Sequence, residues 1–160
     1  VAVGPDVRGE ICVKGPNIMK GYWNRPEATA KAIDAEGWFH SGDVGYLDDE
    51  GYLYICDRLK DMVISGGENI YPAEGESVLF EQPAIAEVAV IGLPDDKWGE
   101  AVTAVAALNA EETLTLEELR SFAESKLARY KLPLKLHVVP QLPRNPAGKV
   151  LKFQLREQLS

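Results

Sequence analysis

The chain has 160 residues, and 46% of them are hydrophobic, which is enough for one domain or slightly more with its own core. Seventeen Lys and Arg residues stand against 25 Asp and Glu, which gives a formal charge of −8. That balance argues against general binding to nucleic acid or to an anionic membrane surface, so any contact with phosphate should be local.

Neither the cysteines nor the first residues suggest export. Cys12 and Cys56 lie far apart without a C-x-x-C spacing, so they are interpreted as small core residues and not as a disulfide framework or a zinc cluster. Residues 1–6 lack a basic stretch and an apolar stretch, and no apolar run approaches the roughly 18–20 residues that cross a bilayer. We therefore expect a reducing, cytoplasmic location and no transmembrane segment.

β-Structure interrupted by one helix is predicted for the first third of the chain. Residues 9–15 and 52–56 are short and rich in β-branched or aromatic residues, as strands are. Asn24 is expected to cap a helix whose alanine-rich body covers 28–33, with Pro26 in its first turn. This region is therefore predicted to be rich in strands.

A charged segment at residues 57–61 is the predicted domain boundary. Four of its five residues are charged, and it separates the apolar strand at 52–56 from another at 62–64. The sequence therefore predicts two domains, at 1–57 and 58–160.

Short strands and helices alternate in the second predicted domain. A loop or tight strand reversal is expected at 65–69, and Thr115 with Glu118 forms the capping box of a helix whose apolar positions run to residue 130. The other elements are a short helix from Tyr71 that ends before Pro83, strands at 85–92, 101–108 and 136–139, and a helix at 152–159. This order predicts an α+β fold with a short sheet flanked by helices.

Three segments carry residues suited to chemistry, and each also has an ordinary alternative. Asp43 follows a Ser-Gly pair, where it could accept hydrogen bonds from a sugar diol or be a surface turn residue. The Gly66-Gly67 pair would allow a thin ligand close to the backbone, or form an ordinary hairpin turn. Lys149 ends a short turn, where it could bind phosphate as a point charge or be simply solvated.

The common motifs for phosphate loops and metal sites are missing from the sequence. Pro143 stands where a P-loop ending at Lys149 requires glycine, and Val150 stands where it requires Ser or Thr. His40 and His137 are isolated in sequence from the cysteines and from each other, so metal or Cys–His chemistry is not indicated. Residue types and spacing alone therefore leave the function open.

Five segments carry a combined pattern: Gly9-Glu10-Ile11 with Gly21-Tyr22-Trp23, residues 37–43, residues 57–61, residues 65–72 and residues 143–149. Taken together, they resemble the adenylate-forming superfamily and, within it, the acyl-CoA synthetases. They follow one another in that family's order and at its intervals, over essentially the whole chain. The resemblance implies that 1–57 is the end of the large N-terminal domain, a barrel-like subdomain, and that 58–160 is the small mobile C-terminal domain.

This resemblance implies an ATP-dependent acid–thiol ligase that works in two steps. A carboxylic acid and Mg-ATP give an acyl adenylate and pyrophosphate, and coenzyme A then displaces AMP to give a thioester. Asp43 would bind the ribose hydroxyls of the nucleotide with Arg58 beside the same sugar, and Lys149 would be the catalytic lysine of the first step. No metal ligand is expected in this chain, because Mg²⁺ is held mainly by the N-terminal domain and by ATP phosphates.

The resemblance also implies a rotation of the small domain between the two steps. Lys60 matches the hinge, and after rotation Gly66 and Gly67 would line the pantetheine channel while Lys149 moves away. The family's phosphate loop, adenine platform and acyl pocket lie upstream, so the chain alone is expected to be inactive. Its acid substrate is not specified, with a family-level preference for medium or long fatty acids. Gly75 departs from the family, which usually has an aliphatic residue there, and a glycine inside a helix costs about 0.5–1 kcal/mol.

Other interpretations stay open. The parent could be an adenylation domain that loads a carrier protein, and a luciferase-like oxygenase is less favoured because residues 157–160 are not a peroxisomal S-K-L signal. A different class is a binding module that keeps the fold without catalysis. The expected partners are the upstream N-terminal domain, the acid and coenzyme A, and association of copies through strands of residues 1–57 is a further alternative.

Overall fold

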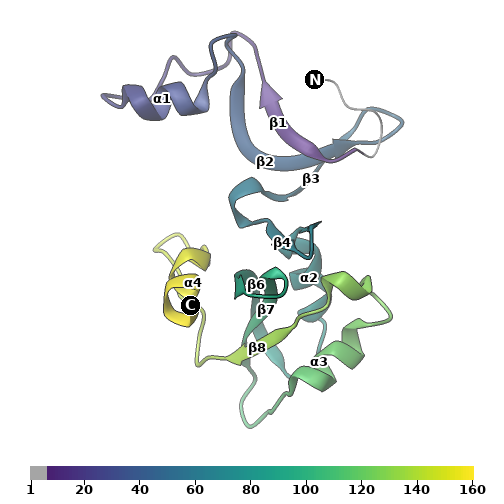
Figure 1. Cartoon of the computed structure of the whole chain (residues 1–160). Coiled ribbons are helices and arrows are strands. Elements are labelled where there is room, and N and C mark those ends of the chain that lie inside the picture. The colour runs from purple at the N-terminus through teal and green to yellow at the C-terminus, as the bar shows by residue number, and fades with distance from the viewer. Residues whose placement is uncertain (1–6) are drawn as a thin grey trace. The chain divides into compact units, whose positions relative to one another are not determined.

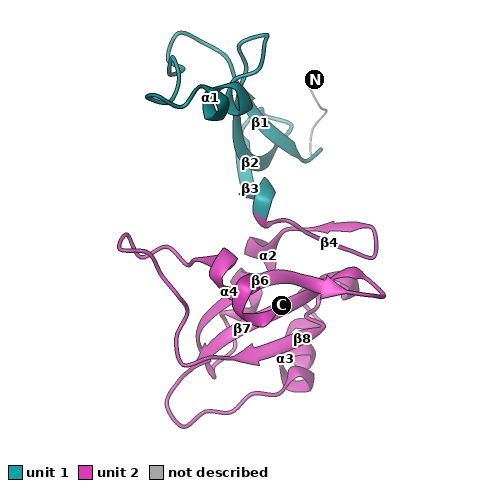
Figure 2. Cartoon of the chain, turned by 60° about the vertical axis from the view of Figure 1, so that its left-hand side comes forward, with its two compact units in different colours: residues 1–60 teal, residues 61–160 magenta. Residues whose placement is uncertain are grey.

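The computed structural model describes residues 7–160. The chain divides into two compact units, unit 1 up to residue 60 and unit 2 from residue 61 to 160 (Figure 2). Residues 1–6, where the sequence suggests no export signal, lie outside the described residues. The division falls inside the charged segment 57–61. That residues 1–57 and 58–160 belong to two different domains of a longer protein stays a prediction.

Unit 1 is a three-stranded antiparallel sheet with one helix (Figure 1). The strands are β1 (Gly9–Val13), β2 (Phe39–Leu47) and β3 (Leu53–Arg58), and β2 lies in the middle. β1 and β3 lie where strands are predicted. β2 was not predicted, and the interpretation of Asp43 as a surface turn residue is wrong, because this part of the chain pairs with a strand on each side.

Helix α1 (Pro26–Ala32) starts differently from the prediction. Asn24 is not its N-cap: that position is Arg25, which makes no side-chain capping bond, while Asn24 is left-handed with φ 51°. The loop before the helix is held instead by Thr29, whose hydroxyl accepts from the Tyr22 amide and donates to the Arg25 carbonyl, both at 2.9 Å. A side chain inside the helix therefore replaces the expected cap.

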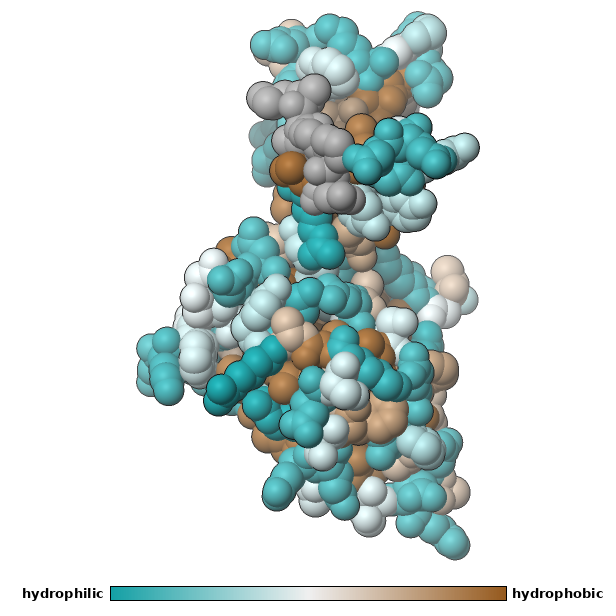
Figure 3. Space-filling view, turned by 90° about the vertical axis from the view of Figure 1, so that its right-hand side faces the viewer, coloured by the Kyte–Doolittle hydropathy of each residue, from teal (hydrophilic) through white to brown (hydrophobic). Residues whose placement is uncertain are grey.

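Unit 1 has little core of its own. Val44 is the one buried hydrophobic side chain among residues 7–60. Large apolar side chains are instead exposed, with Trp23 at 96% and Ile55 at 68% of its full accessibility, and Figure 3 shows hydrophobic residues at the surface of this unit. Over residues 7–60 the sheet is open and not a closed barrel.

Unit 2 is built on a five-stranded sheet. Its strands are β4 (Val63–Ser65), β5 (Glu68–Ile70), β6 (Ile85–Asp95), β7 (Gly99–Leu108) and β8 (Lys135–Val138). The order is β5-β4-β7-β6, and β8 pairs with β7 in parallel. β7 is the central strand and β6 lies at one edge. The two form a long antiparallel pair, with register from Ile85 opposite Leu108 to Asp95 opposite Gly99.

Helices cover both faces of this sheet (Figure 1). On one face Leu79 of α2 (Pro72–Leu79) and Leu119 of α3 (Leu116–Ala123) pack in one cluster with Val102 of β7. On the other, Leu155 of α4 (Lys152–Leu159) packs in a second cluster with Val105 of β7. Since residues 102 and 105 point to opposite faces, β7 is buried on both sides, which explains its nearly continuous apolar run. The α+β fold is confirmed.

Helix α3 begins where the local sequence predicts, but it ends earlier than predicted. The predicted capping box is present: the Thr115 hydroxyl accepts from the Glu118 amide at 3.3 Å, and the Glu118 carboxylate accepts from the Thr115 amide at 2.8 Å. The predicted run of apolar positions to residue 130 is too long for one helix, because α3 ends at Ala123 and Tyr130 lies in a separate 3-10 turn, Arg129–Lys131.

None of the helices within residues 7–160 has the length and apolar content needed to span a bilayer.

Gly75 lies inside α2, where a Cβ would be 3.6 Å from Val90 Cγ2, an ordinary contact. Gly75→Ala should therefore stabilise unit 2 by about 0.5–1 kcal/mol, because alanine loses less backbone freedom on folding. Native-state hydrogen exchange of the buried β6 and β7 amides measures this change.

Gly67→Ala is the matched control for that substitution. A Cβ at Gly67 meets no atom within 4 Å, but φ is +85°, so alanine there is strained although space is free. The control should lower protection of the same amides. A change of protection in the same direction for both variants would contradict the conclusion that Gly75 destabilises α2.

Candidate functional site

Asp43 and Arg58 face each other across two neighbouring strands. They are register partners in the β2–β3 pair, and Arg58 Nε lies 3.0 Å from Asp43 Oδ1. The Asp43 side chain is 29% and the Arg58 side chain 48% exposed, so both keep atoms free for a ligand. The Asp43 amide donates to the Ser41 hydroxyl at 3.0 Å, which fixes the backbone before the carboxylate. The strand register thus presents an acceptor and a donor side by side.

The Gly66-Gly67 pair forms the tight turn between β4 and β5. Both residues have positive φ, +60° and +85°, as the hairpin turn between two antiparallel strands requires. A Cβ at Gly66 would lie 2.9 Å from Trp98 Cε3, and the Gly66 amide donates to the Trp98 carbonyl at 2.9 Å. Gly66 is therefore needed for local packing, while Gly67 borders open space. The predicted strand reversal is confirmed.

Lys149 lies at the end of a small braced loop. Residues 144 and 150 form an isolated antiparallel bridge, and the Asn145 amide donates to the Lys149 carbonyl at 2.9 Å. The Asn145 side chain accepts from the Lys149 amide at 2.9 Å, and the Arg144 guanidinium donates to the Gly148 carbonyl at 2.7 Å. The Lys149 side chain itself is exposed, and its ammonium makes no ion pair with residues 7–160. The backbone is thus fixed while the cation projects into solvent.

The segment between the units contains Lys60 and Asp61. Both lie in a 3-10 turn, Leu59–Asp61, in which Lys60 is exposed. Asp61 is buried and lies 3.3 Å from Arg156 of α4 through its Oδ1 atom. Lys60 therefore occupies a short exposed turn at the division of the chain.

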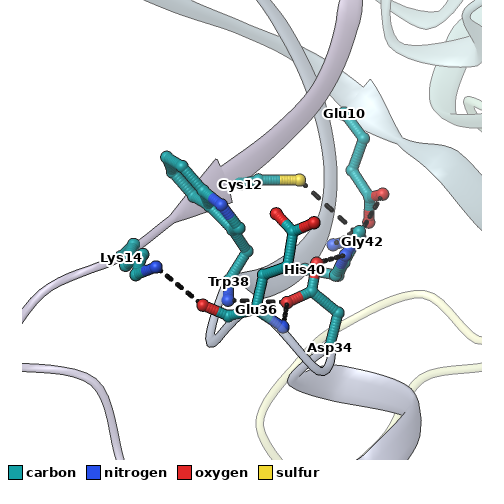
Figure 4. A network of polar contacts seen from close by, with 8 residues as sticks. All are labelled: Glu10, Cys12, Lys14, Asp34, Glu36, Trp38, His40 and Gly42. Carbon is teal, nitrogen blue, oxygen red and sulfur yellow. Dashed lines mark hydrogen bonds and ion pairs between the residues drawn. The ribbon is translucent and has the colours of Figure 1, made fainter. Parts of the chain in front are cut away.

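A second cluster of polar side chains in unit 1 was missed by the sequence analysis (Figure 4). His40 Nδ1 lies 2.9 Å from Glu10 Oε2 and 3.5 Å from Cys12 Sγ, and His40 Nε2 lies 3.5 Å from Asp34 Oδ2. Hydrogen bonding to Glu10, and then to Asp34, raises the pKa of His40 above its ordinary value. Cys12 is exposed, so its interpretation as a core residue is wrong; partial desolvation and then the charge of Glu10 raise its pKa. The available sequence signal for this cluster was the spacing of residues 10 and 12, which places both side chains on one face of a strand.

Comparison with known proteins identifies the relatives of this chain. Residues 74–149 match the family model described as the AMP-binding enzyme C-terminal domain. The chain is 55% identical over 152 residues to the long-chain-fatty-acid–CoA ligase FadD13 of Mycobacterium tuberculosis, with 95% of this chain and 30% of that protein covered. It is 51% identical over 157 residues to the 2-succinylbenzoate–CoA ligase of Bacillus cereus, with 98% of this chain and 32% of that protein covered.

A solved structure gives the same result in three dimensions. The o-succinylbenzoate CoA synthetase MenE of Bacillus subtilis, in complex with its acyl-adenylate intermediate, is 48% identical, with a TM-score of 0.88. The match covers 96% of this chain and 31% of that one. The chain belongs to the adenylate-forming superfamily. Within it, the chain corresponds to the C-terminal portion of acyl-CoA synthetases.

Two facts locate the candidate residues along the chain. The chain spans about 30% of the length of the curated relatives that it matches. The region matched by the C-terminal domain model lies entirely within unit 2 and ends at Lys149. Asp43, Arg58 and Lys60 lie in unit 1, and Gly66, Gly67 and Lys149 in unit 2.

Proposed function

We propose that the chain is the C-terminal part of an acyl-CoA ligase that activates a carboxylic acid with ATP and transfers the acyl group to coenzyme A. The observation that carries this proposal is the exposed, unpaired cation of Lys149 on a braced loop, at the end of the region matched by the AMP-binding C-terminal domain. The relatives' names, fatty acid and 2-succinylbenzoate CoA ligases, support the same reaction class.

In this proposal Asp43 and Arg58 hold the nucleotide. A carboxylate only accepts hydrogen bonds, so it suits the two hydroxyls of a ribose, and a guanidinium supplies donors in a fixed plane. Their strand register and 3.0 Å contact support this role, because each side chain fixes the orientation of the other before a ligand arrives. The same pairing does not suit Mg²⁺, since the Arg58 cation repels it, and we assign no step to a metal at this pair.

Lys149 would act in the first step. Attack of a carboxylate on the α-phosphorus places negative charge on the non-bridging oxygens, and a lysine directed at them stabilises the transition state more than the ground state. A loop that is rigid in its backbone and free at its side chain meets this requirement, because side-chain freedom but little backbone freedom is lost when the ammonium binds.

Lys60 and the glycine turn would act between the steps. A rotation of the small domain needs a few residues that change φ and ψ without breaking a core, and the exposed turn at 59–61 is such a place. Gly66 and Gly67 would then line the channel for the pantetheine arm. Open space at Gly67 and the absence of Cβ atoms support this role.

We propose a fatty acid as the substrate, since the relative with 55% identity is a long-chain-fatty-acid–CoA ligase, and 2-succinylbenzoate is the alternative. The parent protein, incubated with ATP, coenzyme A and a panel of fatty and aryl acids, should form AMP and a fatty acyl thioester. Adenylate without thioester would favour a carrier-protein acceptor instead. No adenylate with any acid would favour the non-catalytic binding module and contradict the proposal.

Asp43→Ala in the parent should raise the KM for ATP about 10–100-fold, because two hydrogen bonds to a charged acceptor are lost. Steady-state kinetics with ATP and the acid varied in turn measure this effect. Asp49→Ala, at an exposed turn in the same unit, is the control and should leave both KM values unchanged. A rise only in the KM of the acid would remove Asp43 from the nucleotide site.

Lys149→Ala should slow adenylate formation by roughly 10²–10³, by analogy with loss of single transition-state donors, and spare the second step. ATP–pyrophosphate exchange measures the first step, and thioester formation from supplied acyl adenylate measures the second. The control is Lys126→Ala, an exposed lysine of unit 2 that pairs with Glu81 and lies outside the Lys149 loop. Equal losses in both half-reactions would refute a role confined to adenylation.

A further inference from the structure

We propose that Glu10, Cys12 and His40 form a binding site for one divalent transition-metal ion, with Zn²⁺ as the ion that suits them best. The three side chains offer a carboxylate oxygen, a thiol sulfur and an imidazole nitrogen, and these ligand atoms all lie within 4.8 Å of one another. This site is independent of the nucleotide pair and of the reaction proposed for the parent.

The strands bring these residues together by their register. Glu10 and Cys12 are two positions apart on β1, so both project from the same face of that strand. Cys12 and His40 are Cα partners in the β1–β2 pair, and an irregularity in the register between residues 10 and 12 lets Glu10 reach the same ring nitrogen. The site thus rests on paired strands and not on loops, which favours precise geometry.

The distances fit a tetrahedral ion. Zinc lies about 2.3 Å from sulfur and about 2.0 Å from nitrogen, which at a tetrahedral angle separates these two ligand atoms by about 3.5 Å. Cys12 Sγ and His40 Nδ1 are 3.5 Å apart. Glu10 Oε2 is 2.9 Å from Nδ1, whereas two ligand atoms about 2.0 Å from one zinc ion lie about 3.3 Å apart, so the carboxylate must move away from the imidazole to share the ion.

Neighbouring groups orient the ligands as they do in metal sites. Asp34 lies beside the other ring nitrogen of His40, with Oδ2 3.5 Å from Nε2, so a proton on Nε2 has an acceptor when an ion takes the place of the proton that Nδ1 shares with Glu10. Asp34 itself accepts from the amides of Glu36 and Trp38, both at 2.9 Å. The Gly42 amide donates to the other oxygen of Glu10 at 3.1 Å. A carboxylate–histidine pair of this kind is the usual outer support of a zinc ligand.

An ordinary hydrogen-bonded histidine is the competing explanation. It explains the contacts of His40 with Glu10 and Asp34. It does not explain why the Cys12 thiol lies beside the same ring nitrogen as Glu10. With a thiolate and a carboxylate as ligands, the site carries two negative charges, which match a divalent cation. Sulfur and imidazole ligands select zinc-like ions over Mg²⁺ and Ca²⁺, which prefer oxygen.

The site has room for a further ligand. A hollow lined by Glu10 and His40, and also by Tyr22, Arg25 and Lys31, opens beside it. Cys12 is exposed, so an ion can enter from solvent. Three protein ligands and one open position are the arrangement in which zinc keeps an exchangeable water or anion.

Binding is tested on the 160-residue chain with Zn²⁺ by calorimetry and with Co²⁺ by absorption spectroscopy. We expect one ion per chain and, with Co²⁺, a thiolate-to-metal charge-transfer band. Cys12→Ser should abolish the band, whereas Cys56→Ser, which removes the other free cysteine, should leave it unchanged. Asp34→Asn should keep the stoichiometry but weaken binding about 10–100-fold, as expected for an outer orienting group.

A measurement on the unmodified chain covers the case in which a variant does not fold. Zn²⁺ should shift the imidazole nitrogen resonances of His40 and leave those of His137 in place. Absence of binding, binding that survives Cys12→Ser, or equal shifts of both histidines would each overturn the proposal.

Discussion

The double pairing of β2 is the constraint on which the chemistry of unit 1 depends. Its β3 edge sets Asp43 opposite Arg58, and its β1 edge sets His40 opposite Cys12. A slip of one residue in either register would turn these side chains to the other face of the sheet. The Asp43–Arg58 pair and the cluster of Glu10, Cys12 and His40 therefore use the same strand through different edges, and each is built from contacts between different strands.

In unit 2, the candidate functional residues lie outside the core. The β6–β7 pair is buried on both faces by three helices, so the core does not depend on the exposed side chain of Lys149. The loop that carries this lysine is closed by backbone bonds around Asn145, and α4 begins directly afterwards at Lys152. The core thus fixes where the loop starts and ends, while the ammonium remains in solvent.

Local signals predicted much of this fold, namely the capping box, the glycine hairpin and the two long core strands. β2 was missed because Gly42 and Gly45 lower its strand propensity, and only pairing on both edges overrides that preference. The Asn24 cap failed because the hydroxyl of Thr29, inside the helix, holds the loop instead. The contact of Cys12 with His40 was beyond prediction, since the two lie 28 positions apart and only the sheet register joins them.

Polar contacts matter more for the stability of unit 1 than for the stability of unit 2. With Val44 as its one buried hydrophobic side chain in the described range, burial of apolar surface contributes little to holding its strands together. Domains with so small a core usually rely on a metal, on disulfides or on packing against further chain. The chain spans about 30% of its relatives, so further chain is available in the parent. A metal held by β1 and β2 would add a link between the same two strands, independently of that packing, and it would restrain the strand that presents Asp43.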